Sequence, residues 1–136
     1  MRLLSWFTAI NVLVACGFSL AGLVAPQVLL PSGSTSTEAS LIFAMYAAAR
    51  SVPLALVTLA VIYKRSVSGL LILGTLAGLI QISDVGVGLY EHDPGKSVGP
   101  LVIALVQFYA VFAFHKSKFN QAKADNALTN HRSPKE

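Results

Sequence analysis

The chain has few charged residues and almost no cysteine. Only 12% of its 136 residues are charged, about half the fraction that is usual in soluble domains. Its single cysteine, Cys16, excludes a disulfide within the chain and a cysteine-based metal pair. The net charge is +4, and most of the basic residues flank apolar runs or lie near the C-terminus. We therefore expect no nucleic-acid partner.

The sequence contains four long apolar runs. Apolar residues make up 54% of the chain and concentrate in residues 3–25, 39–63, 67–90 and 98–115. A helix needs about 20 such residues to cross the hydrocarbon core of a bilayer. The sequence thus predicts an all-α membrane protein in which residues 1–115 form an antiparallel bundle of four transmembrane helices. Residues 116–136 remain as a basic tail, which we expect to be cytoplasmic and flexible.

Basic residues predict the orientation of this multi-pass protein in a cell or plasma membrane. If the helices alternate in direction, one side of the membrane carries five basic residues near the helix ends: Arg2, Lys64, Arg65, Lys116 and Lys118. The other side carries Lys96 together with three acidic residues. Because connections rich in Lys and Arg stay in the cytoplasm, both termini are expected there.

The first apolar run also resembles a secretion signal. Residues 13–16, Leu-Val-Ala-Cys, fit the pattern that precedes a lipid-modified cysteine in bacterial signal peptides. The chain stays apolar through Ala25, however, and a secretory core is only about 7–15 residues long. We therefore expect a retained helix with Cys16 as a small buried apolar residue. Whether Cys16 is ever modified stays open.

The last connection contains turn-forming residues and three adjacent metal-ligand types. Asp93-Pro94-Gly95 predicts a turn, and Gly99-Pro100 predicts the start of the fourth helix. Glu91, His92 and Asp93 are adjacent, so they cannot easily converge on one ion. We expect a solvated loop and no metal.

Small and polar residues recur with the helical period. At 100° per residue, one stripe of the third run spans about 80° and holds Gly74, Ala77, Gln81, Asp84 and Gly88. The first run has a comparable stripe, formed by Thr8, Asn11, Ala15, Ser19 and Gly22. Such stripes let transmembrane helices approach closely. They predict a bundle with its polar atoms inside.

Two ionisable residues lie within the apolar runs. From helix rise, Arg50 lies about 16 Å and Asp84 about 9 Å from the outer ends of their runs. An arginine can extend its side chain along the helix to close such an offset. If their helices are neighbours, these two charges can meet, and the same depth holds further candidate ligand-binding residues: Gln81, Gln107 and Tyr46.

Two interpretations of this cluster remain open. An unpaired Arg or Asp at the centre of a transmembrane helix costs about 2.5–3.5 kcal/mol on insertion scales. Arg50 and Asp84 could therefore join two helices as a structural ion pair. They could instead form a site for a proton or for the polar or anionic headgroup of a ligand. The two roles do not exclude each other.

Three short segments resemble a known family. They are residues 47–50 (Ala-Ala-Ala-Arg), 78–84 (Gly-Leu-Ile-Gln-Ile-Ser-Asp) and 95–100 (Gly-Lys-Ser-Val-Gly-Pro). The chain resembles small four-helix membrane proteins of the DoxX-like type over most of residues 6–115. The resemblance implies at most an accessory role beside a membrane oxidoreductase or in respiratory quinol oxidation. Because the chain lacks the paired histidines that a haem needs, we expect no cofactor of its own.

Two classes of function follow. The first is a non-enzymatic membrane protein that binds a lipophilic or quinone-like molecule, or supports a partner complex or homodimer, through the Arg50–Asp84 cluster. The second is an intramembrane enzyme, such as an isomerase, or a proton-coupled transporter that uses Asp84. Asp84 is the only acid inside a predicted helix core, and general acid–base catalysis commonly recruits a second titratable group. We therefore favour the first class and assign no catalytic residue.

Overall fold

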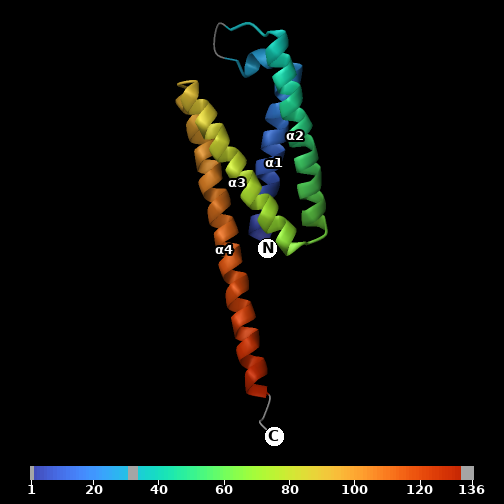
Figure 1. Ribbon diagram of the computed structural model, residues 1–136, viewed down its shortest axis with the longest axis vertical. Helices are drawn as coiled ribbons and strands as arrows, with labels where there is room; N and C mark the ends of the chain where they lie inside the picture. The colour runs from blue at the N-terminus through green and yellow to red at the C-terminus, as the bar shows by residue number, and fades with distance from the viewer. Residues whose placement is uncertain (1, 31–33, 133–136) are drawn as a thin grey trace.

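The computed structural model describes residues 2–30 and 34–132 and is an all-α antiparallel four-helix bundle, as the sequence predicts (Figure 1). Its elements are α1 (Arg2–Val24), the short 3-10 helix η1 (Pro26–Val28), α2 (Glu38–Tyr63), α3 (Val67–Tyr90) and α4 (Pro94–Arg132). We call the end with the N-terminus and the α2–α3 connection the basic end. The opposite end, with the α1–α2 and α3–α4 connections, is the far end.

All four helices are long and apolar enough to cross a membrane. The most apolar stretch of each has a mean hydropathy between 1.7 and 2.0. Large apolar side chains lie on the outside of the bundle, among them Trp6, Phe43 and Leu105, which are 69%, 72% and 61% exposed. Exposed apolar surface of this extent marks a protein that contacts membrane or a partner. The chain is thus a multi-pass membrane protein.

Polar side chains fix where the helices begin. The Thr37 hydroxyl accepts from the backbone N–H of Ser40, and the Ser40 hydroxyl accepts from that of Thr37, which is a capping box at the start of α2. Ser66 caps α3 by accepting from the N–H of Gly69 at 3.3 Å. The first three helices begin and end within one residue of the expected ranges.

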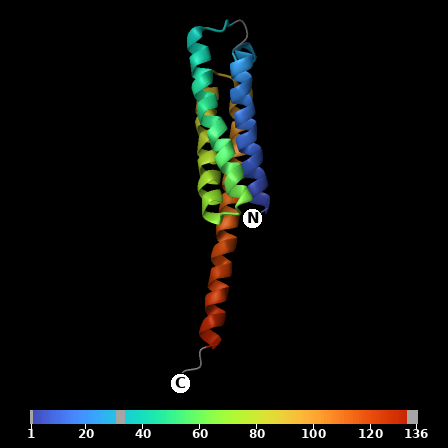
Figure 2. The ribbon, with the colours of Figure 1, turned by 90° about the vertical axis from the view of Figure 1, so that its right-hand side faces the viewer.

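The fourth helix differs from its expected range at both ends. It begins at Pro94, and Pro100 lies inside it, so the prediction that Gly99-Pro100 starts the helix is wrong. The cause is Asp93, whose Oδ1 accepts from the N–H groups of Gly95 and Lys96 at 2.9 and 3.3 Å and so satisfies the first turn. Beyond the bundle, α4 continues as a helix to Arg132 (Figures 1 and 2).

The four helices do not contact one another equally. α1 touches all the others, whereas α3 packs mainly on α4, and α2 does not touch α4 in the described part of the chain. α2 and α3 meet near their connection, where Val61 lies against Gly69, and again where Ala55 and Ala77 share a buried cluster with Val12 of α1. Toward the far end, α3 leans away from α2 (Figure 1).

Candidate functional site

Four neutral side chains form a buried polar layer between α1, α3 and α4. They are Thr8, Asn11, Gln81 and Gln107, none more than 4% exposed. The Gln81 Nε2 donates to Asn11 Oδ1 at 2.6 Å, and the Gln107 Nε2 donates to Thr8 Oγ1 at 2.9 Å. Such bonds contribute about 0.6–2 kcal/mol each between transmembrane helices. The polar layer therefore fixes α3 and α4 against α1.

Two glycines of α3 make room for this arrangement. A Cβ at Gly74 would lie 3.0 Å from Gln107 Nε2 and 3.3 Å from Thr8 Oγ1. A Cβ at Gly78 would lie 2.9 Å from the ring of Phe108. These two glycines, of which Gly74 belongs to the predicted stripe, therefore let α3 approach α1 and α4 at the depth of the polar layer.

Two atoms of the polar layer have no hydrogen-bond partner among the described residues. They are Asn11 Nδ2, a donor, and Gln107 Oε1, an acceptor. A buried polar group without a partner costs about 1–3 kcal/mol. The polar layer can thus donate one further hydrogen bond from Asn11 Nδ2 and accept one at Gln107 Oε1. Its own side chains are an alcohol and three amides, so they cannot transfer protons as an acid or base near neutral pH.

The two charged residues lie elsewhere. Both Arg50 and Asp84 are exposed on the surface of the bundle. No ion pair within 4.0 Å joins Arg50 and Asp84; the ion pair found among the described residues is between Lys96 and Glu91. The two charges are therefore not bonded to each other.

Their positions follow from the point where α2 and α3 part. Arg50 lies four residues from Leu54, and Asp84 lies seven from Ala77; Leu54 and Ala77 belong to the cluster where α1, α2 and α3 meet. Residues four and seven apart share a helix face, so the charges lie on the sides of α2 and α3 that turn toward this three-helix cluster. They stand beyond the junction toward the far end, where the helices diverge in Figure 1.

The five predicted ligand-binding residues therefore occupy two places. Gln81 and Gln107 belong to the buried polar layer. Arg50 and Asp84 lie on the exposed α2–α3 face, and so does Tyr46, whose side chain is 65% exposed. Their role in binding a ligand stays a prediction. The sequence placed Thr8 and Asn11 on the inner stripe of α1, but nothing in the pattern identified them as the partners of the glutamines.

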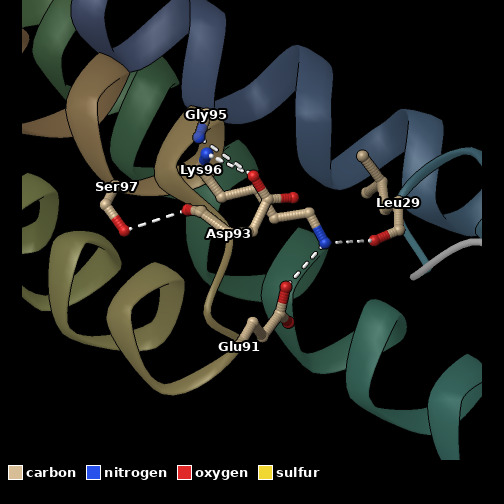
Figure 3. A network of polar contacts seen from close by, with 6 residues as sticks. All are labelled: Leu29, Glu91, Asp93, Gly95, Lys96 and Ser97. Carbon is tan, nitrogen blue, oxygen red and sulfur yellow. Dashed lines mark hydrogen bonds and ion pairs between the residues drawn. The ribbon is translucent and has the colours of Figure 1, made fainter.

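A third set of polar contacts, around Lys96, lies at the far end of the bundle (Figure 3). The Lys96 Nζ donates to Glu91 Oε2 at 2.6 Å and to the Leu29 carbonyl oxygen at 3.1 Å. It thereby joins the α3–α4 turn to the segment that follows η1. The described part of the chain contains no group of three side chains able to hold a metal; Glu91 is bonded to Lys96, and Asp93 caps α4.

The surface also has an open apolar hollow of about 500 Å³ between α3 and α4. Its lining includes Leu71, Leu76, Val111 and His115. The pattern of the sequence did not predict it, because every lining side chain except Thr75 and His115 is of the kind that faces lipid. Neither Arg50 nor Asp84 lines it.

The chain matches no protein-family profile, no curated protein and no solved structure. The likeness to DoxX-like proteins therefore stays a prediction from short motifs.

Proposed function

We propose that the protein is a non-enzymatic accessory protein of the membrane, which acts by binding another membrane component against its α2–α3 face. We define this face as Arg50 and Asp84 together with exposed side chains that the helical period places on the same sides of their helices: Phe43, Tyr46 and Val57 on α2 and Val87 on α3. One observation supports the proposal above the others: two ionisable groups are exposed at membrane depth and make no ion pair with each other.

The cost of exposing these charges to lipid favours a covering partner. Arg50 lies 12 residues from the start of α2 and 13 from its end, which places it about 18 Å from the nearer end. An arginine stem cannot extend that far to reach water. A charge left at such depth costs about 2.5–3.5 kcal/mol on insertion scales. A partner that offers an opposite charge or a hydrogen-bonding group removes much of this cost.

The chemistry of the site supports binding over catalysis. The polar layer has no titratable side chain, and the other acids of the chain lie at helix ends or in the tail. Asp84 would have to act without a second acid or a histidine from the helix cores. The bound component would be a molecule with a polar headgroup or, as the DoxX-like resemblance implies, a helix of an oxidoreductase. Binding either one requires no acid–base chemistry.

Photo-crosslinking in native membranes tests the proposal. A photoreactive amino acid at Tyr46 should give a discrete adduct with a protein or a lipophilic molecule. Phe112 of α4 is the matched control, because it is 66% exposed on a helix that does not touch α2. Replacing both Arg50 and Asp84 with leucine should remove the adduct at position 46. If positions 46 and 112 give the same bulk-lipid products with and without the charges, the proposal is wrong.

A further inference from the structure

We infer that the component bound by the α2–α3 face is a second copy of this chain, in a two-fold dimer in which Arg50 of each copy pairs with Asp84 of the other. This inference rests on the proposed function, because it requires that the face bind a membrane component. It adds the identity of that component.

The charges on the face are self-complementary. The face carries one cation and one anion, Arg50 on α2 and Asp84 on α3. In a two-fold interface the same patch is used twice, so residue i of one copy meets residue j of the other and the reverse. A second copy therefore supplies both missing partners at once. Another protein would need its own opposite charges or hydrogen-bonding groups at both depths.

The direction of the helices favours the pairing. A two-fold axis along the membrane normal keeps every residue at its own depth and places α2 of one copy antiparallel beside α3 of the other. Side chains on a helix tilt toward its N-terminus, so Arg50 tilts toward the far end and Asp84 toward the basic end. By helix rise their axial offset is about 9 Å, and these opposite tilts reduce it.

The surroundings supply packing but no competing charge. The apolar neighbours on the face are Phe43, Val57 and Val87, which are 72%, 52% and 57% exposed. They would cover the two ion pairs and exclude lipid headgroups and water. Both charges are exposed on the surface of one copy, so a neighbouring copy can approach them.

Two variants of the chain, each with one of the two charges reversed, test the dimer. Arg50→Glu leaves a face with two acids, and Asp84→Arg leaves a face with two cations. Each variant alone should dimerise at least about tenfold more weakly, because both symmetric pairs are lost. Mixing the two variants restores both pairs. The introduced glutamate of the first copy meets the introduced arginine of the second, while the native Asp84 of the first meets the native Arg50 of the second. The mixture should therefore dimerise close to the wild-type level.

The measurement is energy transfer between copies with donor and acceptor fluorescent proteins at their C-termini, in phosphatidylcholine vesicles over a range of protein-to-lipid ratios. A single chain carrying both reversals is the folding control and should also dimerise. If this control dimerises and the mixture does not, the charges pair within each chain and the inference is wrong. If the wild type stays monomeric while position 46 crosslinks another component, the inference fails and the proposed function stands.

Discussion

The polar layer and the α2–α3 face both hold polar side chains at membrane depth, but they hold them differently. In the polar layer, Gln81 and Gln107 are buried and bonded to α1. On the face, Arg50 and Asp84 are exposed and have no ion-pair partner within 4.0 Å in the described chain. The polar layer inside the bundle thus consists of neutral side chains, whereas the two charged side chains at membrane depth face outward.

The difference follows from the cost of burial. A neutral amide loses water that a single hydrogen bond largely replaces, so it can join helices within one chain. A charge away from water loses far more and requires a partner, and the described chain supplies neither Arg50 nor Asp84 with an ion-pair partner within 4.0 Å. We infer that the amides stabilise the fold, whereas the charges serve association. Each region can be perturbed without touching the other.

Overfilling the polar layer should have the largest effect. Gly74→Leu forces side-chain atoms into Gln107 and Thr8, because even a Cβ there would lie 3.0 Å from the Gln107 amide nitrogen. We expect a loss of about 2–3 kcal/mol in the free energy of unfolding, measured by chemical denaturation in detergent. The control is Gly86→Leu on the same helix, where a Cβ meets nothing within 4 Å. Equal losses for the two variants would contradict the packing described for α3.

Removing one side of a buried hydrogen bond should have the next largest effect. Gln81→Leu leaves Asn11 buried with no partner for its Oδ1, which should lower the free energy of unfolding by about 1–3 kcal/mol. Adding Asn11→Leu removes both partners, together with the already unpaired Asn11 Nδ2. The double variant should therefore recover much of the loss in the same denaturation assay. A double variant that loses as much as the sum of both singles would argue against this bond.

The sequence predicted much of this architecture for physical reasons. Runs of about 20 apolar residues identify transmembrane helices because the bilayer imposes that length. The 3.6-residue period then identifies the inner side of each helix, and Gly74, Ala77 and Gln81 are indeed buried. The start of α4 could not be read from Pro100, since a competing cap at Asp93 comes first in the chain.

The partners of the polar residues could not be predicted in the same way. A stripe about 80° wide faces more than one neighbouring helix, and the pattern does not say which neighbour lies opposite each position. Gln81 and Asp84 share a stripe, but Gln81 donates to Asn11 of α1 whereas Asp84 is exposed. Asp84 lies three residues nearer the far end, toward which α3 leans away from α2 (Figure 1). The divergence of α2 and α3 depends on how all four helices pack, so no local sequence pattern predicts it.

Removing a charge from the face should affect folding less than removing an amide from the layer. Arg50→Leu takes away a side chain that forms no ion pair within the described chain, so the monomer in detergent should change by less than about 1 kcal/mol. The same variant in vesicles should lose association. If Arg50→Leu destabilises the monomer as much as Gln81→Leu does, the charges stabilise the fold and the contrast between the two regions disappears.

The Lys96 contacts at the far end should have the smallest effect, because they combine charge with exposure. Lys96 and Glu91 have side chains that are 37% and 31% exposed, and ion pairs of this kind contribute about 0.2–1 kcal/mol. Lys96→Met keeps the apolar stem and removes the bonds to Glu91 and the Leu29 carbonyl. We expect a loss of about 0.5 kcal/mol at low salt and less at high salt, where exposed charges are screened. Glu91→Gln is the control, since it removes the charge but leaves the Leu29 bond. A loss that salt does not change would show that Lys96 acts through the Leu29 carbonyl alone.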